Sequence, residues 1–200
     1  MQESVALVGW VVYVGIAFGL RTWMQLRATG ETGFVGLRRG AGALERLAGL
    51  LMVAAFLASL GAPIASWTGA APLLVTSAPL AIAGAVLIAL GTAATLHAQI
   101  AMSTSWRIGV DPDARTELVT DGPFAHVRNP IFTAMIVASL GFALACPSVL
   151  GLVAPVALVI ALELQVRRVE EPYLVRVHGE RYLGYARRTG RFVPLVGRLG

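Results

Sequence analysis

Five long apolar runs, separated by short polar or charged segments, constrain this chain more than any other feature of its sequence. The runs cover residues 4–20, 47–64, 79–102, 130–145 and 149–162, and none contains Asp, Glu, Lys or Arg. Only 14% of the 200 residues are charged, whereas a soluble domain usually has about 25%. Because charges are costly in hydrocarbon, this pattern predicts an all-α, polytopic membrane protein with about five transmembrane helices. A soluble all-α protein with a very apolar core is the less favoured alternative.

The fourth and fifth runs are separated only by residues 146–148, which predicts a tight antiparallel helical hairpin. Both runs are short for a membrane span. Gly84 and Gly91 lie seven residues apart in the third run, so they share a helix face that another helix can approach closely. From Glu163 onward the chain is amphipathic and charged, which predicts a cytoplasmic helical segment. We expect membrane helices one to three in residues 1–102 and a catalytic core in residues 103–200, packed as one domain.

The arginines indicate how the helices are oriented. All 16 basic residues are Arg, and links 65–78 and 146–148 hold none of them. The positive-inside rule therefore places the N-terminus outside and the C-terminus in the cytoplasm. Abundant Arg, Ala and Gly without Lys are typical of a GC-rich bacterial genome, so we expect the inner (plasma) membrane. The Arg-bearing links hold Arg21, Arg27, Arg38, Arg39 and Arg46, then Arg107, Arg115 and Arg128, and eight more follow Glu163.

The densest motif runs from Glu117 to Phe132 and precedes the hairpin. Pro130 suits the first position of a helix, because its missing N–H would have no partner there. Asn129 then becomes a candidate N-cap, and Arg128 lies at the positive end of the helix, where anionic groups bind. The alternative is a capped helix with an interfacial Arg. The polar segment 103–129 also holds the acids Asp111, Asp113, Glu117 and Asp121.

Two further motifs follow the hairpin. Glu170 and Glu171 are adjacent carboxylates near the membrane surface, and Arg167 is spaced to offset their charge on a continuous helix. Pro172 predicts a kink or restart of the helix there. The alternative is a solvated charged tail. The third motif comprises Gly179, Tyr182, Tyr185, Arg191 and Pro194, and its alternative is an aromatic packing stripe on the membrane surface.

In their order around the hairpin, these motifs resemble the isoprenylcysteine carboxyl methyltransferase family and its phospholipid methyltransferase relatives. Those proteins carry Leu-Val-Thr-x-Gly-Pro-Tyr and Arg-His-Pro-x-Tyr before the hairpin. After it they carry Glu-Glu-x-x-Leu, a Gly, Tyr-x-x-Tyr, an Arg and a Pro. Here Phe124, Asn129 and Phe132 replace the usual Tyr, His and Tyr. The resemblance covers about residues 103–196.

The resemblance implies an S-adenosylmethionine-dependent methyltransferase whose cofactor is enclosed by the hairpin and the C-terminal segment. Arg128 and the start of the hairpin suit the cofactor carboxylate, Glu170 suits its amino group or ribose, and Phe124 or Phe132 suits adenine. The implied cofactor-binding residues are Leu118, Val119, Phe124, Arg128, Asn129, Pro130, Ile131, Phe132 and Glu170. The candidates for orienting or deprotonating the acceptor are Arg107, Glu171 and Tyr182.

The resemblance implies carboxyl O-methylation of an acceptor like a prenylated cysteine, reached sideways from the bilayer. A carboxylate acceptor needs no base at neutral pH, whereas an amine or thiol would need one. Methylation of a lipid amine, a quinone or another lipophilic molecule is an alternative within the same chemistry. Two less favoured functions are a sterol-reductase-like enzyme using nicotinamide and a membrane scaffold or transporter subunit. We expect membrane lipids as partners, and neither nucleic acid nor a metal.

Overall fold

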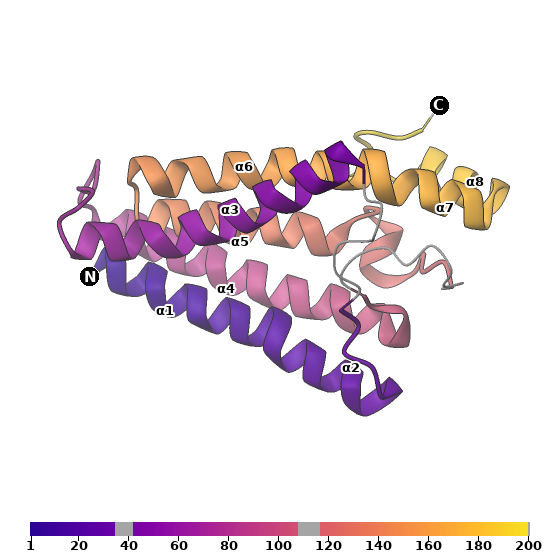
Figure 1. Cartoon of the computed structure of the whole chain (residues 1–200), viewed down its shortest axis with the longest axis horizontal. Helices are drawn as coiled ribbons and strands as arrows, with labels where there is room; N and C mark the ends of the chain where they lie inside the picture. The colour runs from indigo at the N-terminus through magenta and orange to yellow at the C-terminus, as the bar shows by residue number, and fades with distance from the viewer. Residues whose placement is uncertain (35–41, 108–116, 200) are drawn as a thin grey trace.

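The computed structural model describes residues 1–34, 42–107 and 117–199, and the described part is all-α. Arg38, Arg39, Asp111, Asp113 and Arg115 lie outside the described residues. Most of the described chain forms long helices that run side by side (Figure 1). The first rod joins α1 (Gln2–Val14), the π-helical turn η1 (Gly15–Leu20) and α2 (Arg21–Thr29), and α3 (Ala43–Trp67), α4 (Ala78–Ala101) and α5 (Pro130–Ala145) follow. The next rod joins α6 (Val149–Gln165), the π-helical turn η4 (Val166–Glu170) and α7 (Glu171–His178), before α8 (Glu180–Arg188). Short 3-10 turns, η2 (Ser103–Ser105) and η3 (Gly122–Ala125), precede α5.

Four of these rods are long and apolar enough to cross a membrane: residues 2–29, 43–67, 78–101 and 149–178. With the shorter apolar helix α5, they confirm the prediction of a polytopic all-α protein with five membrane helices. The expectation that the fifth membrane helix is short was wrong. The helix continues through the charged residues after Glu163. The π-helical turn η4 is a wider turn within this helix and does not end it.

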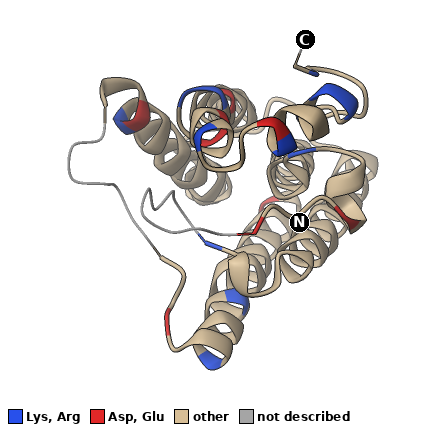
Figure 2. Cartoon of the chain, turned by 90° about the vertical axis from the view of Figure 1, so that its right-hand side faces the viewer, with Lys and Arg blue, Asp and Glu red and all other residues tan. Residues whose placement is uncertain are grey.

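The helix bundle has two chemically different ends. At the end without arginine, where the charged groups are Glu3 and the N-terminal ammonium, links 68–77 and 146–148 meet, and Leu74 N–H donates to the Pro147 carbonyl at 2.7 Å. The N-terminal helix begins there too, since Ser77 N–H donates to Gln2 Oε1 at 2.9 Å. At the charged end lie α7, α8 and the C-terminus (Figure 1), and charged residues gather at the helix ends seen from that side (Figure 2). The two predicted polar segments therefore share one end, as expected, while the orientation in the membrane stays a prediction.

Helix α5 packs very closely against α4 because glycines line their contact. A Cβ added to Gly84 would lie 2.5 Å from the backbone N of Ala145, and one added to Gly91 would lie 2.6 Å from that of Ala138. These distances confirm the predicted close approach along the Gly84 and Gly91 face. The contact fixes α5, whose first turn reaches the charged end.

The predicted hairpin of α5 and α6 is confirmed. Ser148 caps α6, its hydroxyl accepting a hydrogen bond from Gly151 N–H at 3.1 Å. Helix α3 packs along α6, and α1 packs against α3 and α4. Small buried residues, together with Tyr13, Phe142 and Leu158, form the shared core.

At the charged end, α2 holds the start of the segment that follows α4. Arg21 donates to the Ser103 carbonyl at 2.5 Å, and Gln25 donates to the Thr104 carbonyl at 3.0 Å. The Arg21 guanidinium also lies 4.5 Å from the ring centre of Trp106, which is almost fully buried. The first rod therefore positions the chain immediately before Arg107.

Candidate active site

A buried ion cluster of Arg128, Glu171 and Arg191 joins the three sequence motifs. Arg128 Nη2 lies 2.8 Å from Glu171 Oε1. Arg191 binds the same carboxylate twice, with Nε 2.7 Å from Oε1 and Nη2 3.0 Å from Oε2. All three residues are buried. Because buried charges persist only when they are paired and hydrogen-bonded, this cluster fixes the start of α5, the start of α7 and the C-terminal segment together.

Arg128 uses the rest of its guanidinium to bind the C-terminal backbone. It donates to the carbonyls of Ala186, Thr189 and Gly197, at 2.9, 2.5 and 2.9 Å. A planar fork of five donors is well suited to several acceptors at once. Arg128 therefore holds the end of α8 and the segment after it against the hairpin.

The tyrosine pair in α8 makes a second connection to the first motif. The Tyr185 hydroxyl donates to the Phe124 carbonyl at 2.6 Å. Tyr182 and Tyr185 pack edge to face, and Leu118 packs against them. Burial raises the pKa of Tyr182 to about 12. This phenol therefore stays protonated at neutral pH, so it can donate a hydrogen bond but does not act as a base.

Helix α5 starts where the sequence predicts, but its cap differs from the prediction. Pro130 is the first helical residue and Asn129 occupies the N-cap position, as expected. The Asn129 side chain makes no capping bond; its Nδ2 donates to the Arg191 carbonyl at 3.1 Å instead. The Arg191 carbonyl is within reach of this amide because the Asn129 backbone N–H also donates to it, at 3.1 Å. The first N–H groups of α5 are left without a side-chain cap, which is a place where an anionic group binds well.

The two adjacent carboxylates of the second motif have different surroundings. Glu171 is buried in the ion cluster, whereas Glu170 is only partly buried and accepts a long hydrogen bond from Gln165 Nε2, at 3.4 Å. The expected pairing of Arg167 with these carboxylates was wrong, because Arg167 pairs with Glu163 one turn earlier. The π-helical turn η4 ends directly before Glu171 and Pro172, so the helix is irregular there but does not restart, and the predicted kink stays a prediction.

The remaining predicted site residues also lie at or near the charged end. Val119 is partly buried, and Arg107 follows the buried Trp106. Ile131 and Phe132 are partly buried and pack against the main core from the first turn of α5. Sequence reasoning placed Arg191 in a motif but gave it no role, although a buried Glu near an Arg-containing motif could have indicated the pair. In the described residues, no three His, Cys, Asp or Glu side chains are grouped so as to hold a metal ion.

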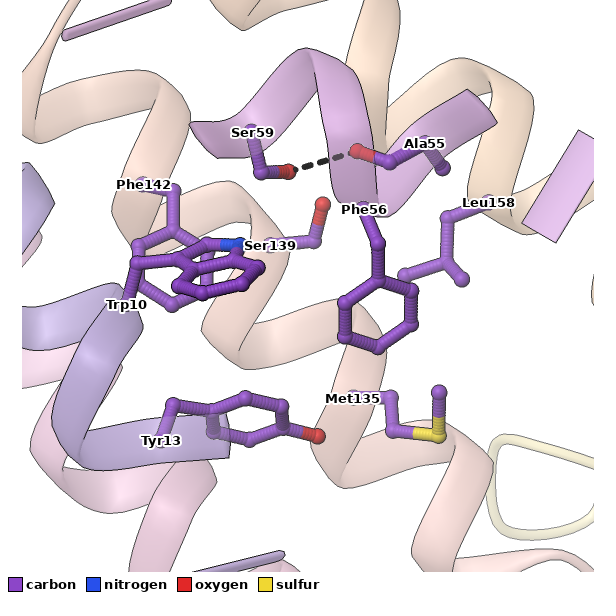
Figure 3. A pocket seen from close by; sticks show the side chains of 9 residues that line it. All are labelled: Trp10, Tyr13, Ala55, Phe56, Ser59, Met135, Ser139, Phe142 and Leu158. Carbon is purple, nitrogen blue, oxygen red and sulfur yellow. Dashed lines mark hydrogen bonds between the residues drawn. The ribbon is translucent and has the colours of Figure 1, made fainter. Parts of the chain in front are cut away.

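A small cavity lies inside the bundle, apart from this site (Figure 3). It measures about 20 Å³ and is lined by Trp10, Tyr13, Ser139 and Phe142, among others. Within the described part of the chain, Trp10 Nε1 and Ser139 Oγ have no hydrogen-bond partner. A cavity of this size holds about one water molecule. It is therefore too small for the lipid tail of an acceptor.

The three motifs thus converge on one charged end of a membrane bundle, as the family resemblance implies. A profile of phospholipid methyltransferases matches residues 80–181, just over half of the chain. Comparison with curated proteins found no significant match. The matched region runs from α4 through the hairpin and η4 into α8, and includes Arg128, Glu170 and Glu171. The chain therefore belongs to the phospholipid methyltransferase family and is a membrane methyltransferase that uses S-adenosylmethionine.

Proposed function

We propose that the start of α5 and Glu170 bind the amino-acid part of S-adenosylmethionine. The uncapped first turn of α5 supplies N–H groups for the cofactor carboxylate. Glu170 supplies a partly accessible carboxylate for its ammonium group or ribose hydroxyls. The Arg128–Glu171 ion pair, at 2.8 Å, keeps these two elements together. This complementarity of opposite charges supports the proposal and agrees with the chemistry of the cofactor.

The proposed adenine contacts are aromatic and apolar. Phe124 in η3 and Phe132 in α5 lie on either side of the link 126–129, and Leu118 and Val119 lie upstream of them. We include Pro130 and Ile131 because they begin the turn whose N–H groups, from Ile131 onward, are proposed to bind the cofactor carboxylate. Arg128 belongs to the proposed site through the frame it builds, since its guanidinium already binds Glu171 and three carbonyls.

The bound cofactor supplies a methyl group activated by its sulfonium charge, so the protein has mainly to align the acceptor with it. Glu171 is held by two arginines and Tyr182 stays protonated, so neither supports proton removal from an acceptor. Arg107 is the third predicted acceptor residue, and its positive charge favours an anionic group. With Glu170 assigned to the cofactor, the three predicted acceptor residues favour an acceptor that is nucleophilic without deprotonation.

We therefore propose a lipophilic carboxylate as the acceptor, of which a prenylated cysteine is the example that the resemblance gives. A lipid amine is the alternative, because the family name itself refers to phospholipids. The apolar part of the acceptor enters from the bilayer and its carboxylate reaches the charged end. We further propose that residues 103–200 carry the chemistry, packed on the membrane helices of residues 1–102. The charged end faces the cytoplasm of the inner (plasma) membrane in this proposal.

Transfer of a labelled methyl group in reconstituted vesicles tests the choice of acceptor. N-acetyl-S-farnesylcysteine represents the carboxylate, and phosphatidylethanolamine represents the lipid amine. A methyl ester releases labelled methanol in alkali, whereas an N-methyl group is stable, so the same assay identifies the bond formed. We expect alkali-labile label from the carboxylate. Stable label in phosphatidylethanolamine alone would overturn the carboxylate proposal and support the amine.

A second readout separates the acceptor from the cofactor. Calorimetry with S-adenosylhomocysteine measures cofactor binding without any acceptor. Binding without transfer to either compound would reject both acceptors while leaving the cofactor site intact. No heat of binding to folded protein would instead reject the proposed cofactor site.

A further inference from the structure

The C-terminal segment after α8 presents an apolar turn at the charged end. Val193, Leu195 and Val196 are 55%, 69% and 62% exposed. They do not belong to a membrane helix, whose lipid-facing side chains are expected to be exposed. They lie instead in an irregular turn, residues 193–196, that follows the buried ion cluster in sequence.

Hydrogen bonds and close backbone packing hold the apolar turn in one conformation. Arg191 N–H donates to the Val196 carbonyl at 2.8 Å, and Val196 N–H donates to the Val193 carbonyl at 3.1 Å. The turn closes over Gly190, where an added Cβ would lie 2.0 Å from the Val193 carbonyl oxygen. Leu195 has a φ of 68°, a left-handed conformation that is unfavourable for a bulky residue. The fold therefore holds a large apolar side chain exposed in an unfavourable backbone conformation.

The level of the turn relative to the hydrocarbon core indicates what can cover it. The Phe192 carbonyl accepts a hydrogen bond from the Thr133 hydroxyl at 2.7 Å, in the first turn of α5. Helix α5 has 16 residues and is therefore about 24 Å long at 1.5 Å per residue, less than the roughly 30 Å of a hydrocarbon core. A helix shorter than the hydrocarbon core does not extend past it, so we take the first turn of α5 to lie on the hydrocarbon side of the headgroups, near their boundary. Residues 193–196 follow Phe192 directly, so they reach the same level.

Positive charge flanks the turn on both sides. Arg188 and Arg198 are exposed, and Leu199 N–H donates to the Ala186 carbonyl at 3.1 Å, which brings the two arginine-bearing stretches together. Apolar side chains beside basic ones are the composition of segments that bind an anionic bilayer surface. Without a bilayer beside it, the turn would expose its three apolar side chains to water.

We propose that the apolar turn inserts into the bilayer interface at the charged end, with Leu195 in the lipid and Arg198 among anionic headgroups. The turn is linked to Arg191 and Gly197, which bind Glu171 and Arg128. Lipid contact therefore restrains the segment that completes the buried ion cluster. This inference concerns the bilayer as partner and holds for any methyl acceptor.

An environment-sensitive fluorophore on Leu195→Cys tests the insertion. The native Cys146 is fully buried, so wild-type protein serves as the labelling blank. Glu180→Cys, on the exposed side of α8, is the matched control. Both labelled proteins are reconstituted in an equal mixture of phosphatidylcholine and phosphatidylglycerol. We expect the Leu195 probe to show blue-shifted emission, quenching by nitroxide-labelled lipid and protection from iodide, and the Glu180 probe to show the reverse.

Iodide quenching of the Leu195 probe without lipid quenching would overturn insertion. Equal lipid quenching at both positions would also overturn it, because the whole C-terminal segment would then lie on the bilayer. The charge is tested by repeating the measurement with Arg198→Gln and with phosphatidylcholine alone. We expect a smaller blue shift in each case, and an unchanged shift would reject the role of anionic headgroups.

Discussion

Replacing each of the two adjacent carboxylates by Gln should have different consequences, a loss of stability for Glu171 and a loss of cofactor affinity for Glu170. Glu171 accepts three hydrogen bonds from two buried arginines, at 2.7, 2.8 and 3.0 Å. A Gln side chain offers one acceptor oxygen and turns an N–H₂ group toward the other donor. Removing one partner of a buried ion pair costs about 3–5 kcal/mol. Since a domain is stable by only about 5–15 kcal/mol, Glu171→Gln should strongly destabilise the charged end.

Glu170→Gln should leave the fold nearly unchanged, because this side chain is partly exposed and its bond from Gln165 is long. Gln also keeps the size of the side chain and removes a charge that burial and the neighbouring Glu171 disfavour. A charge-assisted hydrogen bond to the cofactor contributes about 1.5–3 kcal/mol, so its loss should weaken cofactor binding roughly 10- to 100-fold.

The assay combines denaturation in detergent with calorimetric titration of S-adenosylhomocysteine. Glu171→Asp is the control for Glu171→Gln, since it keeps the charge and shortens the side chain by one methylene. Wild-type stability in Glu171→Gln would refute the assignment of the buried ion cluster as the frame of the site. Unchanged affinity in folded Glu170→Gln would remove Glu170 from the cofactor site.

Three further predictions address packing, pH and topology. Gly91→Ala should destabilise the bundle by about 1–3 kcal/mol, because the new Cβ would lie 2.6 Å from the backbone N of Ala138. Gly184→Ala, with open space around it, is the control, and equal melting temperatures of the two variants would contradict the packing argument. The pKa of Tyr182 is raised from 10.0 to about 12 in the folded protein, so the unfolded chain loses this proton first and stability should fall as pH rises from 10 to 12. The stability of Tyr182→Phe should fall less steeply over this range, and identical slopes would argue against a buried phenol. A green fluorescent protein fused to the C-terminus should be fluorescent, because it folds in the cytoplasm, and a fusion active only outside the cytoplasm would reverse the predicted topology.

The membrane architecture could be predicted because hydrocarbon imposes a simple requirement on sequence. Apolar runs must be long and uncharged, so α5 was predicted at its observed bounds, Pro130–Ala145. The glycines at positions 84 and 91 likewise indicated a close contact before its partner was known. The fifth membrane helix was underestimated, because a run of apolar residues shows where hydrocarbon ends and not where the helix ends.

The pairing of side chains at the site could not be predicted from spacing along the chain. Arg167 has the right spacing for Glu171 on a regular helix, yet Glu171 binds Arg128 and Arg191, which are 43 and 20 residues away. Asn129 has the right residue type for a cap, yet its amide binds the Arg191 carbonyl. In both cases a tertiary partner replaces the local one, and its position depends on how the C-terminal segment folds back.

The π-helical turn η4 decides which of the two carboxylates is buried. In the helix that runs from α6 through η4 into α7, buried residues recur four apart at Ala154, Leu158, Leu162 and Val166, the spacing of one face of an α-helix. A regular helix would place Glu170 next on that face. The wider turn adds one residue, so the next buried position is Glu171, five residues after Val166. π-helical turns of this kind often occur at functional sites. Here Glu171 binds the two arginines, whereas Glu170 stays outside the ion cluster and accepts a hydrogen bond from Gln165. A local change of helical register therefore gives two adjacent, identical residues different surroundings.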